Sequence, residues 1–443
     1  MSVQFSGTPD HDYGTQGVAD IPPEPPYNPD VTSLQVGPST LDVKGRLVVF
    51  GRNPADSSPG LLTRLNADGQ WDENTGHVVV DAANLPDEAL DFKGLVGATI
   101  NGQQTYFAVG VPTYFDAGFK RFLNFIGISR FDEGFQPVRS FGDNGHALPD
   151  PGKGWQTGDA GRAKPQREKD STKALLYSEE RPLAFANGLL RVIFPYTVGD
   201  VDGEHPESWL AVFNPVTGDL APELGEARDR GMLPLTDKGG SPLRVLRAHF
   251  FADGSFLVLA ENASQRVIVR RYDRHAIADE RFNDGQGQRE LFDFQGGMRL
   301  GMFARNGRIA VSQGVEFQLQ QPTTVFVLTE SGTNDTTFNR GQPLTLGSVG
   351  HGLALGELHI DDQDRIVLGG ALLTATNAGR MHVYRLTRSG EFDSTFGNEG
   401  LFDGGPDFRT ANKVFASEHG IHILTLFPPS GGYFLERMLK LHG

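Results

Sequence analysis

Short apolar runs, arranged in pairs around a tight turn, recur along the whole chain. Examples are residues 256–260, which follow the turn Asp253-Gly254, and residues 309–311, which follow Asn306-Gly307. Asp-Gly or Asn-Gly between apolar runs is the strongest short-range signal for a β-hairpin. Each pair is followed by a further apolar run, such as residues 267–272. The pattern predicts repeated units of three or four antiparallel strands, which is the content of one propeller blade.

A polar motif rich in Gly and Asp separates these units. Its clearest copy is residues 390–400, and its Asp residues are regularly spaced, since 393 − 335 = 58 and 335 − 279 = 56. Looser copies bring the total to seven, and they lie at residues 332–341, 278–285, 218–225, 140–145, 68–72 and 7–17. Repetition at this period indicates a repeat architecture.

The motif has a structural interpretation. Its Gly residues supply positive φ where the chain reverses, and its Asp or Asn side chains bond to nearby backbone, so each copy is expected to be a compact turn. Its aromatic residues are expected to fill crevices between adjacent repeats, burying roughly 2 kcal/mol or more each. These are Tyr13, Phe141, Phe282, Phe338 and Phe396. A catalytic group is needed once, whereas these residues recur, so we interpret them as structural.

The two ends of the chain are complementary halves of one repeat. The N-terminal segment carries a motif with no strands before it, and residues 414–441 contain strands with no motif after them. The sequence therefore predicts an all-β, seven-bladed β-propeller, a single domain over residues 1–443. We expect the N-terminal segment to complete the C-terminal blade and close the ring, which removes two exposed sheet edges.

The motif also carries a family resemblance. The pattern Gly-x-apolar-Asp-x-Ser/Thr-Phe-Gly-x-x-Gly follows an apolar strand that ends in Arg-Leu, and it resembles the bacterial delta-60 repeat. That family is thought to form β-propellers. The resemblance covers nearly the whole chain, is strongest at residues 382–400 and 325–341, and weakens at Val138 and Ala221. It implies the fold and supplies no catalytic signature.

Composition narrows the classes of function. The 56 Gly and 31 Phe residues fit short strands and many turns, and the absence of Cys excludes disulfides and thiolate chemistry. A net charge of −15 argues against binding to duplex nucleic acid or anionic membranes. No apolar window of about eighteen residues or secretory signal is seen. We expect a monomer without cofactor or metal, either cytoplasmic or exported by a signal-independent route.

Departures from the repeat are the places where binding groups are most expected. Residues 149–173 form a Gly-rich, locally basic insertion that contains Trp155, whose ring could stack on a sugar or a base or could fold over its own blade. Residues 199–205 carry alternating carboxylates but lack the remaining ligands of a calcium loop. Residues 361–364 are interpreted as a solvated turn.

Basic residues cluster near the starts of the predicted innermost strands. They are Lys93, Arg181, Arg244, Arg247, Arg299, His351, Arg409 and Lys413. Converging guanidinium groups would bind carboxylates or phosphates. The alternative is that each Arg pairs with an acidic residue of its own blade. As candidate ligand-binding residues we take Arg244, Arg247, Arg299, His351, Lys413 and Trp155.

Two functions from different classes follow. The first, which we favour, is a non-catalytic recognition scaffold that binds a protein partner or a glycan. The second is a hydrolase or lyase that acts on an anionic substrate, such as an acidic carbohydrate, at the channel mouth. In this second case Arg244, Arg299 and His351 would supply binding or acid/base groups. No Ser-His-Asp order, HExxH, phosphate loop or dinucleotide fingerprint accompanies them.

Overall fold

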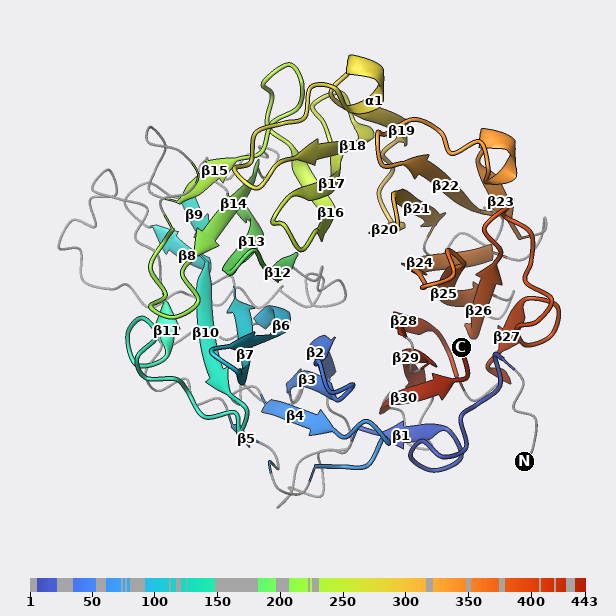
Figure 1. The fold of residues 1–443 in the computed structure, drawn as a ribbon, viewed down its shortest axis with the longest axis horizontal. Helices are drawn as coiled ribbons and strands as arrows, with labels where there is room; N and C mark the ends of the chain where they lie inside the picture. Colours follow the sequence, from blue (N-terminus) through green and yellow to red (C-terminus); the bar gives the residue numbers. More distant parts are fainter. Residues whose placement is uncertain are drawn as a thin grey trace. The chain divides into compact units, whose positions relative to one another are not determined.

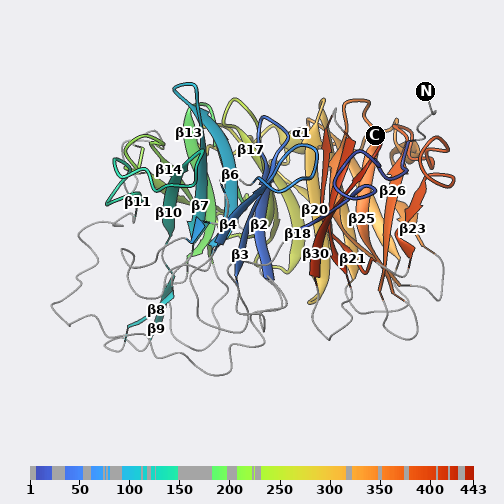
Figure 2. The same cartoon turned by 90° about the horizontal axis from the view of Figure 1, so that it is seen from below.

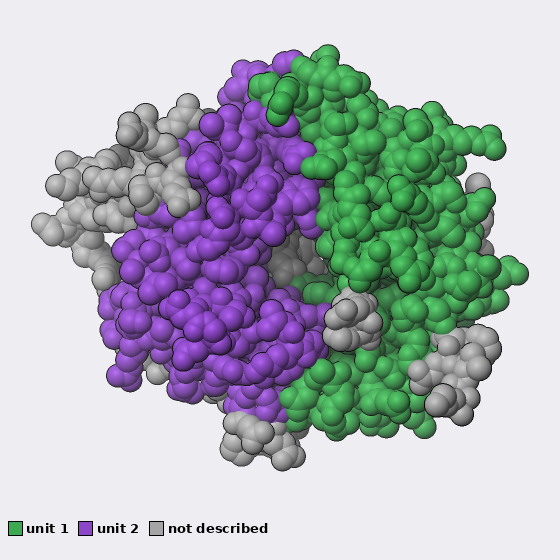
Figure 3. Space-filling model, viewed as in Figure 1, with its two compact units in different colours: residues 1–34, 65–71, 280–443 green, residues 35–64, 72–279 purple. Residues whose placement is uncertain are grey.

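The protein is an all-β chain whose seven four-stranded sheets are the blades of a β-propeller (Figure 1). The computed structural model describes residues 6–21, 35–52, 61–72, 75, 78–79, 92–110, 113–116, 121–124, 126–147, 182–196, 207–221, 224, 231–315, 322–347, 352–373, 379–405, 408–417, 420–427 and 435–443. Two compact units can be distinguished, coloured in Figure 3, and each is described by itself. Unit 1 contains residues 1–34, 65–71 and 280–443, and unit 2 contains residues 35–64 and 72–279.

Unit 1 contains three complete blades. Their strands, in sheet order, are β20 (Met298–Arg305), β21 (Arg308–Val315), β22 (Thr323–Thr329) and β23 (Leu344–Leu346); β24 (Gly352–Ile360), β25 (Ile366–Leu373), β26 (Arg380–Leu386) and β27 (Leu401–Asp403); and β1 (Val18–Asp20), β30 (Leu435–Leu441), β29 (Gly420–Phe427) and β28 (Ala411–Ser417). The unit also holds β19 (Arg289–Asp293) and two short helical turns, α1 (Phe282–Gly285) and η4 (Asn339–Gly341).

Unit 2 supplies the remaining sheets, whose strands are seen from the side in Figure 2. In sheet order they are β2 (Gln35–Leu41), β3 (Leu47–Arg52), β4 (Leu61–Leu65) and β5 (Val78–Val79); β11 (His146–Ala147), β10 (Gly127–Asp132), β7 (Gln103–Gly110) and β6 (Phe92–Ile100); β12 (Leu183–Ala186), β13 (Leu189–Tyr196), β14 (Glu207–Phe213) and β15 (Met232–Pro234); and β16 (Arg244–Phe250), β17 (Phe256–Glu261) and β18 (Arg266–Tyr272), followed by β19. A two-stranded sheet pairs β8 (Thr113–Asp116) with β9 (Arg121–Asn124).

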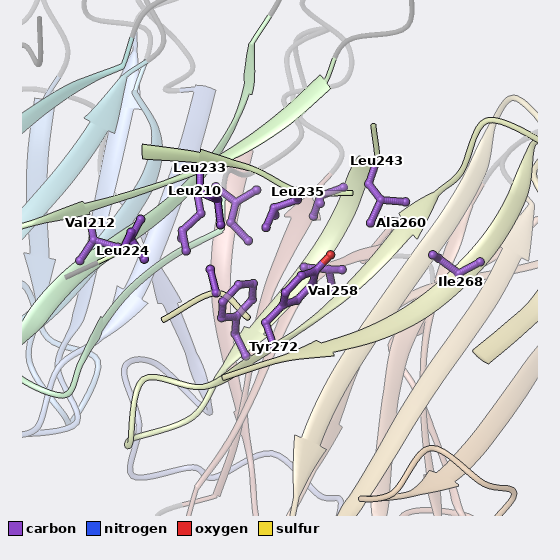
Figure 4. Close-up of a cluster of buried hydrophobic side chains, with 14 of the residues drawn as sticks. Leu210, Val212, Leu224, Leu233, Leu235, Leu243, Val258, Ala260, Ile268 and Tyr272 are labelled. Atoms are coloured by element: carbon purple, nitrogen blue, oxygen red, sulfur yellow. The ribbon is translucent and has the colours of Figure 1, made fainter. Parts of the chain in front are cut away.

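The core of unit 2 lies between the faces of neighbouring sheets. Apolar side chains of β14, β15, β17 and β18 pack together in one cluster, shown in Figure 4. Leu210, Leu235 and Val258 in this cluster are fully buried. Alternate residues on each strand face one neighbouring sheet or the other, so nearly every strand position of β17 is apolar and buried.

The predicted turn motif is present seven times. In each copy one residue of the turn has positive φ, and the residue two positions later bridges to the end of the preceding strand. The seven residues are Gly7, Gly69, Phe135, Gly218, Ala276, Gly332 and Gly390. Asp393 shows how the turn is held, since its Oδ1 accepts hydrogen bonds from the backbone N–H and the hydroxyl of Thr395 at 3.0 and 2.6 Å. The predicted Asx-type turn is therefore correct.

The aromatic residues of the motif are buried, as predicted, and each reaches the following copy. Tyr13, Phe141, Phe282, Phe338 and Phe396 are at most 2% exposed. The residue after each ring donates its N–H to the carbonyl just before the positive-φ glycine of the next copy. These bonds are Gly14 to Asp68, Gly142 to Thr217, Asn283 to Ser331, Asn339 to Ser389 and Gly397 to Ser6. Ring and hydrogen bond together join adjacent blades.

The N-terminal segment completes the C-terminal blade, as predicted. Strand β1 pairs antiparallel with β30, with Val18 opposite Leu439, and the two lie side by side in Figure 1. Pro9 bridges to Leu441, and Lys440 donates its N–H to the carbonyl of Gly17 at 3.0 Å. The first and last segments of the chain therefore share one sheet, in which β1 is the edge strand and covers the outer side of β30.

Candidate functional site

The two predicted arginines of β16 lie in unit 2. Arg244 forms an ion pair with Glu261 of the neighbouring strand β17, with Nη1 2.9 Å from Oε2. Arg247 donates from Nη1 to the carbonyl of Leu246 at 2.8 Å, beside a β-bulge. Arg244 thus follows the alternative interpretation, in which an Arg pairs with an acidic residue of its own blade.

Arg299 and Lys413 lie in unit 1, on β20 and β28. Strand β24 contacts both of these strands, so the first strands of three blades are neighbours. The guanidinium of Arg299 reaches across to Thr410, with Nη1 3.5 Å from Oγ1. Lys413 follows a β-bulge, and its ammonium lies 5.8 Å from the Phe415 ring. We call Arg299, Thr410 and Lys413 the inner-strand site.

An acidic residue belongs to the same layer of strands. Glu357 of β24 is half-buried and also follows a β-bulge, between Leu355 and Glu357. Bulges re-aim the side chains beside them and are frequent next to functional sites. The first strands of unit 1 therefore carry both charge signs, with three basic side chains, Arg299, Arg305 and Lys413, and the carboxylate of Glu357.

Several predicted positions cannot be placed. Trp155, His351 and Arg181 lie outside the described residues, as do the insertion 149–173 and the carboxylate-rich stretch 199–205. Lys93 is half-buried on β6 and Arg409 is half-buried just before β28. Of the six candidate ligand residues, Arg299 and Lys413 lie in unit 1, on first strands that both contact β24.

The acidic run 361–364 forms a hairpin turn. Asp361 accepts hydrogen bonds from the backbone N–H groups of Gln363 and Arg365, both at 2.9 Å, and its other oxygen lies 2.6 Å from Arg365 Nε. These bonds occupy the carboxylate. Within the part of the chain that the structure describes, no group of three or more His, Asp or Glu side chains is arranged to hold a metal ion.

Sequence reasoning missed a group of polar side chains on the outer strands β26 and β27. We call Arg380, His382, Tyr384 and Asp403 the polar cluster. His382 and Asp403 are directly opposite each other in the register of the two strands. The side chain of His382 is 8% exposed, whereas those of Arg380 and Asp403 are 46% and 35% exposed. The cluster therefore extends from the blade interior to the surface.

Hydrogen bonds and ion pairs connect the four side chains. His382 Nδ1 lies 3.2 Å from the Tyr384 hydroxyl, and His382 Nε2 lies 3.9 Å from Asp403 Oδ1. Arg380 Nε is bonded to the same Asp403 oxygen, which also accepts the backbone N–H of Gly405 at 2.9 Å. The Tyr384 ring lies 5.9 Å from the ring of Phe392, a residue that is 51% exposed.

The environment keeps both titratable rings neutral. Burial lowers the pKa of His382 and outweighs the Asp403 carboxylate, which acts in the opposite direction. Burial and the Asp403 charge raise the pKa of Tyr384. At pH 7 the cluster therefore pairs a protonated phenol with a neutral imidazole, one group able to donate a proton and one able to accept it.

Comparison of the repeats would have revealed this cluster. Tyr384 is two residues, and His382 four residues, before the apolar residue that bridges to the turn motif. The counterparts of Tyr384 are Thr63, Ser129, Ala211, Arg270, Phe326 and Leu439, and those of His382 are Leu61, Gly127, Trp209, Ile268, Thr324 and Arg437. Neither His nor Tyr is a requirement of the blade at these positions, which points to another role.

Comparisons with known proteins support the fold. No family model matches the chain, and no curated protein matches it. Membership of the delta-60 repeat family therefore stays a prediction. Among solved structures, the chain is similar to the polysaccharide lyase Uly1, with 9% identity, 99% and 96% of the two chains covered and a TM-score of 0.50.

Two further solved structures are similar at lower scores. Prolyl oligopeptidase B from Galerina marginata has 9% identity and a TM-score of 0.48, with 89% and 47% of the chains covered. A sialidase from Trypanosoma rangeli has 9% identity and a TM-score of 0.37, with 92% and 55% covered. This chain spans about half the length of those two proteins, and the likeness to all three concerns the fold alone.

No membrane-crossing helix is found within the described ranges, because none of the helices there is both long and apolar enough.

Proposed function

We propose that this protein is a non-catalytic recognition scaffold that binds an anionic group, carried by a protein partner or a glycan, at the inner-strand site. The observation that carries the proposal is the reach of Arg299 from β20 to Thr410, three residues before Lys413. These side chains come from two blades that are not adjacent in the sequence. Only the folded protein brings residues of these two blades into contact. The residues of the turn motif, in contrast, recur in every repeat and hold neighbouring blades together.

The chemistry of the inner-strand site suits a carboxylate or a phosphate. A guanidinium offers planar, paired donors that match either anion, and a nearby ammonium adds charge without a fixed direction. The Thr410 hydroxyl can donate a further hydrogen bond. The carboxylate of Glu357 on β24 repels an anion and should therefore weaken its binding, which a Glu357 variant tests separately.

Calorimetric titration of the full chain with trigalacturonic acid and with inorganic phosphate tests the proposal. We expect at least one of them to bind, and the double variant Arg299→Gln, Lys413→Gln to weaken binding by about tenfold or more, or about 1.4 kcal/mol. Glu357→Gln should strengthen binding, since it removes a negative charge from the same strand layer. Lys44→Gln is the matched control, because its exposed ammonium pairs with Glu133.

Two results would reject the proposal. The first is the absence of binding by both anions to the unaltered protein at millimolar concentration. The second is equal affinity in the double variant and in Lys44→Gln, which would show that charge at the inner-strand site has no part in binding.

The second candidate is a hydrolase or lyase that acts on an anionic substrate, and one observation favours it. Tyr384 and His382 form a hydrogen-bonded pair of a protonated phenol and a neutral imidazole, which could pass a proton. The acid/base set expected from the sequence stays a prediction, because Arg244 and Arg299 belong to different units and His351 lies outside the described residues. Turnover of trigalacturonic acid that is abolished by Tyr384→Phe would support this candidate, and equal turnover in that variant would exclude this pair.

A further inference from the structure

The polar cluster contains a buried hydrogen-bonding atom without a partner. His382 is 6% exposed, and its Nε2 makes no hydrogen bond within the described residues. Leaving such a group unsatisfied destabilises the folded protein, because the group has lost its hydrogen bonds to water. Unsatisfied buried groups are rare in folded proteins, and each one needs a specific explanation.

The distance from this atom to the neighbouring carboxylate suits one bridging hydroxyl oxygen. Nε2 of His382 and Oδ1 of Asp403 are 3.9 Å apart, too far for a direct hydrogen bond. One oxygen atom to the side of the line that joins them can lie within hydrogen-bonding distance of both. A hydroxyl suits this position, because it donates to the carboxylate while it accepts from an imidazole N–H.

The charges around the gap select the class of ligand. Asp403 disfavours a carboxylate or phosphate at this point, and Arg380, which is bonded to the same Asp403 oxygen, disfavours a cation. The two charges together leave a neutral group with several hydroxyls as the best match. The exposed parts of Arg380 can donate hydrogen bonds to such a ligand, and those of Asp403 can accept hydrogen bonds from it.

An aromatic surface adjoins the charged groups. The exposed ring of Phe392 lies 5.9 Å from the Tyr384 ring, which lies 5.9 Å from the imidazole of His382. Aromatic side chains supply large apolar area with a defined face. The apolar C–H face of one sugar ring can pack on such a surface while hydroxyls elsewhere in the same saccharide bond to Asp403 and Arg380.

From this arrangement we infer that the polar cluster and Phe392 form a second binding site, which takes a neutral sugar ring. The site differs from the inner-strand site in place and in ligand charge, so either can exist without the other. Phe392 supplies the stacking surface, Asp403 and Arg380 bond the ring hydroxyls, and His382 accepts or donates one internal hydrogen bond to a hydroxyl. Tyr384 fixes the imidazole through Nδ1.

Saturation-transfer NMR and calorimetry on the full chain test this inference with cellotriose, maltotriose and xylotriose as neutral probes. We expect at least one probe to bind and to shift the imidazole nitrogen resonances of His382. Phe392→Ala and His382→Phe should each weaken binding by about tenfold. Because His382→Phe keeps an aromatic ring and removes the unsatisfied atom, it is not expected to unfold the blade.

Ile277→Ala is the matched control, since Ile277 is a 65% exposed apolar side chain in the corresponding turn of another blade. It should bind the probe as tightly as the unaltered protein. Failure of all three neutral trisaccharides to bind at millimolar concentration would overturn the inference. Equal binding of the probe by Phe392→Ala, His382→Phe and Ile277→Ala would also overturn it, because the ligand would then contact neither Phe392 nor Nε2 of His382.

Discussion

The ring of Phe396 lies against Gly7, a residue from the opposite end of the chain. A Cβ atom added to Gly7 would sit 2.7 Å from Cδ2 of Phe396, and the N–H of Gly397 donates to the carbonyl of Ser6 at 2.9 Å. The same relationship joins Phe338 to Gly390 and Phe282 to Gly332. The N-terminal segment is therefore joined to the last turn motif, residues 390–400, by the contact that joins consecutive blades elsewhere.

This close approach predicts that Gly7→Ala is more harmful than an ordinary substitution at positive φ. Gly7 has φ of 76°, so alanine there costs about 1–2 kcal/mol in backbone strain and about 1–3 kcal/mol in overpacking against Phe396. Gly102→Ala separates the two effects, because Gly102 has φ of 80° and open space around its added Cβ. Equal losses of unfolding free energy in both variants would show that the ring does not press on Gly7.

Aromatic rings of the same type should differ strongly in their contribution to stability. Phe338→Ala removes a ring that is 1% exposed and should lower the free energy of unfolding by about 3–5 kcal/mol. Phe392→Ala removes a ring that is 51% exposed and should change it by less than about 0.5 kcal/mol. Denaturant titration checks both values. A small loss in Phe338→Ala would contradict the role of the motif rings as packing between blades.

The ion pair of Arg385 with Asp393 predicts a dependence of stability on pH. Burial alone would raise the pKa of Asp393, but hydrogen bonds from Thr395 and the nearby Arg385 guanidinium outweigh it and hold this pKa below its usual value. The carboxylate therefore stabilises the fold above about pH 4, and this contribution is lost as the pH falls through the folded-state pKa. Asp393→Asn should cost about 3–5 kcal/mol at pH 7 and flatten the acid limb of the stability curve. A curve parallel to that of the unaltered protein would argue against the pair.

His249 on β16 predicts a second pH-dependent effect in a higher range. Burial lowers its pKa to about 4, below the usual value of about 6.5. The unfolded chain binds the proton first, so stability falls as the pH falls from about 6.5 to about 4, by at most about 3 kcal/mol. His249→Phe should remove this part of the dependence, as measured by denaturant midpoints across the range. An unchanged slope would show that His249 is protonated equally in both states.

Much of the fold could be predicted from the sequence because the same physical requirement recurs in each repeat. Asp253-Gly254 and Asn306-Gly307 specify hairpins locally, and the complementary ends specify their own pairing. Copies without glycine were harder to recognise, since Phe135 and Ala276 adopt positive φ where other copies use glycine. At Val138 the Asp is absent, and Arg130 of that repeat instead donates to the carbonyl of Pro215 at 3.0 Å.

Less of the candidate sites could be predicted. The approach of Arg299 to Thr410 depends on blades that are far apart in the sequence, and nothing local encodes it. Nothing in the sequence distinguished Arg244 from Arg299, since both are arginines near the start of a first strand. The structure shows that Arg244 pairs with Glu261 of the neighbouring strand. The polar cluster stayed hidden because His382 and Tyr384 occupy ordinary strand positions. Only a comparison with the corresponding positions of the other repeats sets these two residues apart, and the register of β26 and β27 then places Asp403 opposite His382.

The most direct test of the proposed function is a crystal structure of the full chain soaked with trigalacturonic acid. The account predicts a carboxylate of the ligand within hydrogen-bonding distance of Arg299 and Lys413, with Thr410 bonded to the same group. Ligand density elsewhere on the protein, with these three side chains unchanged, would contradict it, as would the absence of ligand in crystals soaked at millimolar concentration.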